Sequence, residues 1–420
     1  MQPTAPIPAP STPAAASADL KVFVLAMFFS FGGITSLNDV LIPKLKGLFA
    51  LSYAEVMLVQ SAFFIGYLVV SIPAGALVAR IGYMRAATVG LLTVAAGCLL
   101  FVPAAGSALY VAFLGALFVV AAGITIVQVV ANPLISLLGP PETASSRLTF
   151  AQGFNSLGTT IFPPLGGMLI LGAIASGADV AVEASVISRT YIGLAAALCV
   201  LAALVWMRRN RLAETRTAAI NPLAALDLLR RPRFAFGMLG IFCYVGAEVA
   251  IGSLIVNYLA QPTTLALTEA QASHHLAFYW GGAMVGRFAG ALILRYLAPG
   301  KVLAAAAAIA LLLLGLSANS QGAVAGWSLL AIGLFNSIMF PTIFTLACER
   351  LGARTAEGSG LICVAIVGGA VLPPLTGHVA DLTSLAFALV VPAVAYALIA
   401  AFGWYARRPL AEDLEAPVVA

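Results

Sequence analysis

Twelve long apolar runs constrain the fold of this chain more than any other feature of its sequence. A helix needs roughly 20 mainly apolar residues to cross the hydrocarbon core of a bilayer. None of the runs shows the alternating pattern of a membrane β-barrel strand. The sequence therefore predicts an all-α membrane protein with twelve transmembrane helices, at 22–43, 56–79, 86–104, 108–137, 148–172, 189–207, 235–259, 273–297, 301–318, 323–347, 357–379 and 384–405.

Composition excludes most soluble functions. Of the 420 residues 62% are hydrophobic and only 9% are charged, whereas soluble domains are about 45–50% apolar and about 25% charged. The five Cys lie in apolar runs and the three His have no carboxylate or thiol at ligand spacing, so we expect no disulfide and no Cys/His metal site. P-loop, GxSxG and HExxH motifs are absent. We therefore expect neither an enzyme nor an ATP-driven pump, and no cofactor.

The basic residues are unevenly divided between the two sides of the predicted membrane. An even number of spans places both termini on one side, and most of the 21 Lys and Arg residues lie there. The opposite side has Lys44, Lys46 and Arg189, and Arg287 falls inside a span. Because cytoplasmic loops carry the excess of Lys and Arg, we expect both termini in the cytoplasm and the chain in the plasma (inner) membrane.

The long Arg-rich connection at 208–234 divides the runs into two groups of six. A shift of about half the chain aligns the second run with the eighth, and a similar shift aligns the fifth with the eleventh. Parallel six-helix halves related by an axis normal to the membrane define the major facilitator architecture. We expect a disordered cytoplasmic tail at 1–21, pseudo-symmetric six-helix bundles at 22–207 and 235–406, a cytoplasmic linker at 208–234 and a cytoplasmic tail at 407–420.

Asp39 is the first ionisable residue expected at membrane depth, where such groups are costly and are functional candidates by default. A buried, unpaired carboxyl takes up a proton more readily than an exposed one. With amide or carbonyl oxygens around it, such as those of Asn38, it also suits a sodium ion. The alternative is an Asp at the outer interface, because Pro43 and Lys44 follow closely. Nearby Gly32 and Gly33 are expected to loosen the helix.

Glu248 and Arg287 are the other two ionisable residues inside predicted spans. A structural ion pair between them would lower the cost of burying both charges. The functional alternative gives Glu248 the role of a substrate hydroxyl acceptor or a second ion-coupling group, and the two interpretations are compatible.

Several neutral polar side chains share the predicted spans. Amides that face one cavity suit a polyhydroxylated ligand, since each amide and each sugar hydroxyl both donates and accepts. For any single amide, hydrogen bonding between helices is the competing interpretation. Trp280 suits stacking on a sugar ring or anchoring at the interface. The candidate substrate-binding residues are Gln128, Asn132, Gln152, Asn155, Glu248, Asn257, Trp280 and Asn336.

The sequence resembles the fucose:proton symporter family of the major facilitator superfamily, in its glucose/galactose transporter branch. The resemblance covers nearly all twelve spans. It rests on LNDVLIP at 37–43, ANP at 131–133, LGP at 138–140, AQGFNSLG at 151–158, YVGAEV at 244–249, FYWGG at 278–282, FNSI at 335–338 and GSG at 358–360.

The resemblance implies hexose uptake by cation symport through alternating access. It implies a coupling role for Asp39 and a sugar-lining role for Gln152 and Asn155. Fucose-type members carry Glu where this chain has Gln128 and tend to carry Gln where it has Glu248, and this exchanged pattern resembles the glucose/galactose branch. The coupling ion is a proton or sodium, and sodium would make Asp39 a metal ligand.

Three functions remain open from the sequence: a glucose or galactose symporter, a symporter of fucose or another sugar, and an exporter of an amphipathic compound. The number of amides argues against the exporter. A sugar sensor without transport would need a larger soluble domain than the short polar segments allow. We expect a monomer whose partners are a small sugar and membrane lipid, with no nucleic acid.

Overall fold

The computed structural model describes residues 14–49, 53–107, 109–166, 180–212 and 222–410. Within these ranges all regular structure is helical. The N-terminal helices are α1 (Ala14–Phe49), α2 (Tyr53–Ile81), α3 (Tyr83–Ser107), α4 (Tyr110–Leu137), η1 (Pro141–Thr143), α5 (Ala144–Gly166) and α6 (Val180–Met207). After η3 (Pro222–Arg230) come α7 (Pro232–Ala260), α8 (Glu269–Tyr296), α9 (Pro299–Asn319), α10 (Gly322–Asn336), α11 (Met339–Ala347), η4 (Gly352–Arg354), α12 (Thr355–Val364), η5 (Ala365–Val367), α13 (Gly368–Leu382), α14 (Leu385–Ala388) and α15 (Val390–Tyr405).

Eleven helical segments among the described residues are long and apolar enough to cross a membrane. The remaining predicted run, 148–172, corresponds to α5, whose described part ends at Gly166. This helix is the most polar of the predicted spans and carries Gln152, Asn155 and Thr159. The chain is an integral membrane protein, and the predicted all-α fold class is confirmed.

The last three spans are interrupted, whereas continuous runs were predicted at 323–347, 357–379 and 384–405. α10 and α11 are separated at Ser337–Ile338, and α14 ends at Ala388. Pro341 and Pro392 each follow a break by about four residues. Proline lacks the N–H that would bond four residues back, and its ring collides with that carbonyl. The interruptions before Pro341 and Pro392 are therefore local effects of proline, whereas η5 separates α12 from α13 with no proline at that spacing.

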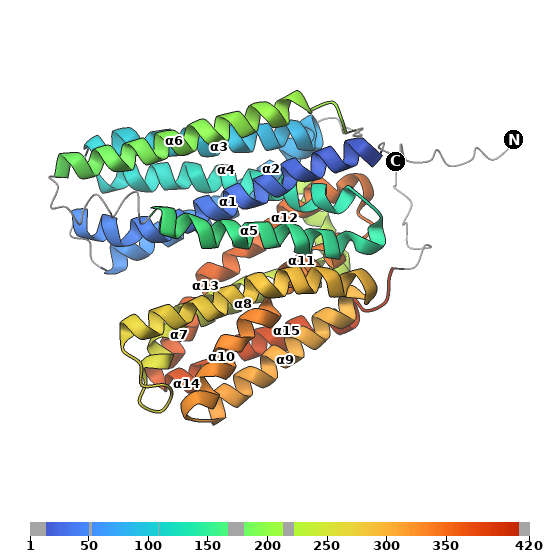
Figure 1. The fold of residues 1–420 in the computed structure, drawn as a ribbon. Helices are drawn as coiled ribbons and strands as arrows, with labels where there is room; N and C mark the ends of the chain where they lie inside the picture. The colour runs from blue at the N-terminus through green and yellow to red at the C-terminus, as the bar shows by residue number, and fades with distance from the viewer. Residues whose placement is uncertain (1–13, 50–52, 108, 167–179, 213–221, 411–420) are drawn as a thin grey trace, which may run out of the picture.

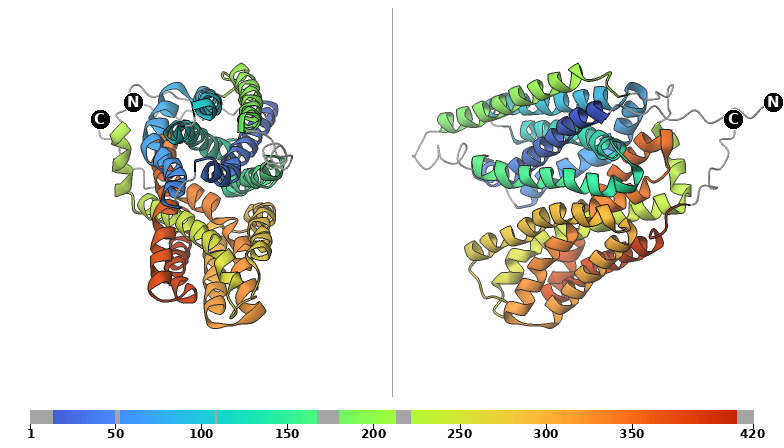
Figure 2. Two further views of the ribbon diagram at one scale, coloured as in Figure 1. Left: turned by 90° about the vertical axis from the view of Figure 1, so that its left-hand side faces the viewer. Right: turned by 45° about the vertical axis from the view of Figure 1, so that its right-hand side comes forward.

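The helices form two bundles that lie side by side, α1–α6 in one and α7–α15 in the other, with α12 and α13 along the boundary (Figure 1; Figure 2). Arg208 pairs with Asp19 at 2.8 Å, which places the end of α6 beside the start of α1. Arg233 donates to the carbonyl of Arg408 at 2.9 Å, which places the start of α7 beside the end of α15. These four helix ends mark one end of the molecule, called here the terminus end.

The two bundles touch mainly through α2 against α12 and α5 against α8. At the first contact two glycines allow close approach of the backbones. A Cβ on Gly75 would lie 2.9 Å from the carbonyl oxygen of Ala356, and one on Gly360 would lie 2.6 Å from that of Ser71. The runs that matched in the internal repeat thus supply the helices that meet across the boundary. The residue limits predicted for the two halves stay a prediction.

Pro133 lies inside α4 and does not end it, although the helix continues for only one more turn. Because proline has no N–H, the carbonyl of Val129 loses its partner within the helix. Ser359 of α12 supplies a replacement, since its buried hydroxyl donates to the Val129 carbonyl at 2.8 Å. Pro133 thus leaves free the carbonyl that joins α4 of the first half to α12 of the second half by a hydrogen bond.

Replacing Ser359 by Ala should destabilise this arrangement of the halves by about 1–3 kcal/mol, the cost of leaving a buried carbonyl unpaired. The measurement is the thermal unfolding of the purified protein. Ser328→Ala is the matched control, because that buried hydroxyl donates to Val324 within its own helix. Equal unfolding temperatures for the two variants would contradict the proposed bond across the boundary.

Candidate functional site

The candidate cation-coupling residues lie on α1, which runs unbroken past them to Phe49. The side chains of Asn38 and Asp39 fall outside the described residues, so the coupling and sodium assignments stay predictions. Gly32 and Gly33 do not interrupt the helix, contrary to the expectation that they loosen it. They allow α5 to pack closely against α1, with Phe162 lying over Gly33.

Gln128 and Asn132 lie four residues apart on α4 and share one helix face. The Oε1 atom of Gln128 is buried without a hydrogen-bond partner among the described residues, and so are both polar atoms of the Asn132 amide. Asn132 has no exposed surface. A buried polar atom without a partner costs free energy. These two amides therefore have hydrogen-bonding capacity that a polar ligand would satisfy.

Gln152 and Asn155 lie on α5, one turn apart. Gln152 is buried, and the Asn155 amide nitrogen donates a long hydrogen bond of 3.4 Å to the carbonyl of Phe28 on α1. α5 thus carries two candidate amides, and that of Asn155 is held against α1 of the same half.

Arg287 crosses from α8 to α5 and connects the two halves. Its guanidinium donates to the carbonyl of Gln152 at 3.2 Å and to the hydroxyl of Ser156. Its Nε atom is buried without a partner among the described residues. Within these residues no direct ion pair joins Arg287 to Glu248; the two charges act on each other through space. The predicted pair is not a direct contact here, because Arg287 is bound to α5.

Glu248 lies on α7 and accepts a hydrogen bond of 2.6 Å from Tyr244, one turn earlier on the same helix. The carboxylate is partly exposed, and its second oxygen has no hydrogen bond to a described side chain. A half-buried carboxyl group with an available oxygen suits a hydroxyl donor.

Asn336 has a different environment from the other candidates. Its amide nitrogen donates to the hydroxyl of Tyr279 at 2.8 Å, and its carbonyl accepts from Tyr396 at 2.7 Å. Tyr279 in turn donates to the backbone of Glu248 at 3.3 Å. All three polar side chains are buried within the second half. Asn336 therefore joins α8, α10 and α15, and supports Glu248 from behind through Tyr279.

Asn257 and Trp280 are the exposed members of the candidate set. Asn257 is exposed near the end of α7. Trp280 is 44% exposed; its ring packs edge-on against Tyr279 at 5.0 Å between centroids and covers Gly252 of α7. An exposed aromatic face beside Glu248's helix is compatible with stacking on a sugar ring.

Sequence reasoning missed Ser156 and Tyr244, although each bonds directly to a charged candidate. A signal was present for both. Ser156 follows Gln152 by four residues and shares its helix face, and Tyr244 precedes Glu248 by four residues. The pairing of Arg287 with α5 carried no such signal, because it joins residues 131 and 135 positions apart.

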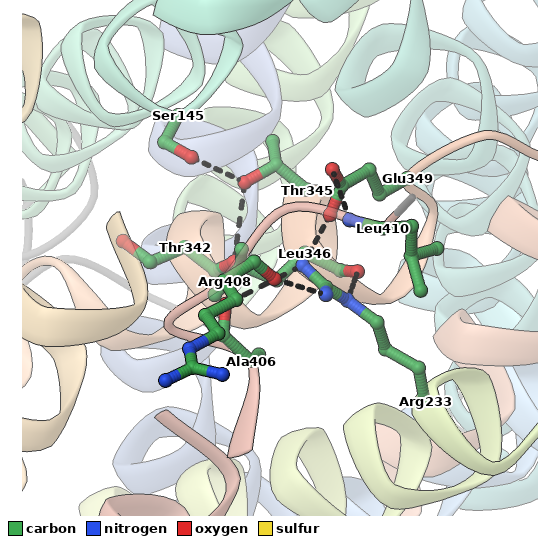
Figure 3. A network of polar contacts seen from close by, with 9 residues as sticks. All are labelled: Ser145, Arg233, Thr342, Thr345, Leu346, Glu349, Ala406, Arg408 and Leu410. Carbon is green, nitrogen blue, oxygen red and sulfur yellow. Dashed lines mark hydrogen bonds and ion pairs between the residues drawn. The ribbon is translucent and has the colours of Figure 1, made fainter. Parts of the chain in front are cut away.

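A polar network closes the boundary at the terminus end (Figure 3). Arg233 forms an ion pair with Glu349 and bonds the Arg408 carbonyl, both within the second half. Ser145 of α5 and Thr345 of α11 share a hydrogen bond of 2.6 Å that crosses between the halves. Nearby, a hydrogen bond from Arg354 lowers the pKa of the Asp227 carboxyl in η3. This end of the boundary is joined by polar contacts.

The model of the Major Facilitator Superfamily matches residues 23–366. The chain belongs to this superfamily. Its members are membrane transporters rather than enzymes, in agreement with the prediction.

Two curated relatives cover most of the chain. It is 49% identical to the glucose/galactose transporter of Brucella abortus biovar 1 (strain 9-941) over 377 residues, 90% of this chain and 91% of the relative. It is 33% identical to the L-fucose-proton symporter of Escherichia coli (strain K12) over 399 residues, 90% of each chain. The crystal structure of FucP in the outward conformation aligns with a TM-score of 0.84 at 31% identity, covering 94% of this chain and 100% of that one. These likenesses confirm the predicted family branch.

Asn336→Ala should lower the unfolding free energy by about 1–3 kcal/mol, because the hydroxyl of Tyr396 then loses its buried acceptor. Thermal unfolding of the purified protein measures the effect. Asn257→Ala removes an exposed amide of the same type and should leave the transition unchanged. If both variants have the unfolding temperature of the wild type, Asn336 does not act as a structural bridge.

Proposed function

We propose that this chain takes up a hexose, glucose or galactose, by symport with a cation. The observation that carries the proposal is the set of unpaired buried polar atoms on both sides of the boundary, at Gln128, Asn132 and Arg287. Each needs a hydrogen-bonding partner. A hexose carries several hydroxyls, each of which both donates and accepts, and so matches a mixed set of amides, carboxylate and guanidinium.

The choice of glucose or galactose is supported by the relatives. The Brucella abortus protein, 49% identical, has that name. The L-fucose-proton symporter of Escherichia coli is more distant at 33% identity. Gln128 and Glu248 show the exchange of amide and carboxylate that the resemblance links to the glucose/galactose branch.

In the proposed mechanism the sugar binds between the halves. Gln128, Asn132, Gln152 and Asn155 contact it from the first half, and Glu248 from the second. In this structure Arg287 is hydrogen-bonded to α5, through the Gln152 carbonyl and the Ser156 hydroxyl. A sugar hydroxyl that accepts a hydrogen bond from Arg287 would weaken the contact between α8 and α5. Sugar binding and the rocking of the halves would therefore both depend on this contact. The coupling free energy is reciprocal: sugar binding shifts the equilibrium between arrangements of the halves by as much as the arrangement changes the affinity for sugar.

Asp39 supplies the coupling to the ion gradient in this proposal. A bare carboxylate at membrane depth opposes closure over the site, and a proton or sodium ion relieves that cost. No other cofactor is proposed. We propose that both termini lie in the cytoplasm and the chain in the inner membrane. The basic residues Lys21, Arg208 and Arg295 near the terminus end support this orientation. The transporter is proposed to act as a monomer.

Gln128→Leu should weaken glucose binding about tenfold or more, the loss of one buried hydrogen bond to the sugar. The unfolding temperature should stay the same or rise, because the substitution removes an unpaired buried oxygen. Binding is measured by titration of the purified protein with glucose, and Gln321→Leu, at an exposed position, is the control. Unchanged glucose affinity in Gln128→Leu would contradict the assignment.

Asp39→Asn should abolish uphill accumulation of labelled glucose in proteoliposomes while exchange of glucose across the membrane continues. Asp381→Asn, an exposed carboxylate on α13, is the matched control and should accumulate sugar normally. Replacing sodium and adding a proton uncoupler in the same assay identifies the ion. Uphill accumulation that persists in Asp39→Asn would refute the coupling role, whereas failure of every variant and the wild type to move glucose would refute the substrate.

A further inference from the structure

A groove of about 410 Å³ lies at the terminus end, on the outside of the contact between the halves. α1, α4 and α5 form one wall, and α8 of the other half forms the opposite wall. Three basic side chains line it, Lys21, Arg147 and Arg295, and no acidic side chain does. The groove is not part of the proposed sugar site, and the transport mechanism uses none of the three.

The positive charges in the groove are not neutralised by direct contacts. Arg147 donates to four neutral oxygens at the end of α4 and in the loop that follows it. Glu142 acts on it only through space. Among the described residues no carboxylate forms an ion pair with Lys21 or Arg295, and the nearby Asp19 is paired with Arg208. The groove therefore presents a concentrated positive potential.

The charged and apolar residues of the groove are separated by depth. Lys21, Arg147 and Arg295 lie near the terminus-side ends of α1, α5 and α8. About one turn further along the same helices, toward the middle of the membrane, lie Leu25, Phe150 and Leu292. Phe150, Phe288 and Leu292 are 43%, 37% and 60% exposed. Charges at the height of the headgroups above an open apolar wall match the two parts of a phospholipid.

We propose that this groove binds an anionic phospholipid of the leaflet at the terminus end. Its phosphate lies between Lys21, Arg147 and Arg295, and an acyl chain lies along Phe150, Phe288 and Leu292. Free phosphate would satisfy only the charges and leave the aromatic wall exposed. A basic pocket between membrane helices on the cytoplasmic side is a typical headgroup site.

The lipid would contact both halves at once, because Lys21 and Arg147 belong to one and Arg295 to the other. Beside the groove, Ser146 of α5 donates to the carbonyl of Ala291 on α8 at 2.6 Å. Any ligand that binds this arrangement better than a separated one shifts the population toward it. The phospholipid therefore stabilises the state in which the terminus end is closed.

The test is a titration of the full-length protein in neutral detergent with phosphatidylglycerol, phosphatidylcholine or inorganic phosphate, read as the apparent melting temperature. We expect a saturable rise with phosphatidylglycerol alone. Lys21→Gln combined with Arg295→Gln should weaken its apparent affinity about tenfold or more. Arg211→Gln combined with Arg231→Gln removes the same charge from exposed positions outside the groove and should leave the affinity unchanged.

Leu292→Trp provides a second variant that keeps every charge and fills the apolar wall at a position already 60% exposed. It should also lose the response to phosphatidylglycerol, which keeps the test decisive if the charge variant does not fold. An equal rise with phosphatidylcholine, an equal rise with inorganic phosphate, or full retention of the response in Leu292→Trp would each overturn the proposal. None of these outcomes depends on whether glucose is transported.

Discussion

Arg287 carries a positive charge from one half of the protein into hydrogen bonds with the other, and the candidate site is organised around that contact. Its partners, the Gln152 carbonyl and the Ser156 hydroxyl, belong to the most polar of the membrane helices. A charge at this depth must be bound to polar groups. Movement of the halves must therefore give Arg287 other hydrogen-bond acceptors. Two groups could replace the α5 acceptors: the carboxyl group of Glu248, which interacts with Arg287 through space, and a sugar hydroxyl.

Small residues and a proline shape the contact of α12 with α2 and α4. Gly75 and Gly360 bring two backbones close together, and Pro133 releases the Val129 carbonyl that Ser359 then binds. Such contacts are specific but individually weak, on the order of 1 kcal/mol each. A boundary built from several weak bonds holds one arrangement of the halves yet can be exchanged for another when a ligand changes the balance by a few kcal/mol.

The fold was predictable because apolar length and the placement of Lys and Arg are local properties of the sequence. The candidate amides on α4 and α5 were also predictable, since residues three or four positions apart share a helix face. Contacts between distant residues were not. Arg287 could equally have paired with Glu248 by sequence, and Asn336 could equally have faced a sugar; only packing reveals that Tyr279 and Tyr396 satisfy its amide. The helix breaks before Pro341 and Pro392 were signalled by the prolines themselves, but the predicted spans were drawn from the length of the apolar runs alone.

The central claim is that sugar moves only when the contact between α5 and α8 opens. The direct test is a disulfide between Ser146→Cys and Ala291→Cys, where the Ser146 hydroxyl now meets the Ala291 carbonyl, in a background without the five native cysteines. Reconstituted protein is assayed for glucose uptake before and after reduction. The account predicts no uptake with the bond formed, retained glucose binding, and recovery of uptake on reduction. Uptake at the same rate in the cross-linked and reduced protein would contradict it.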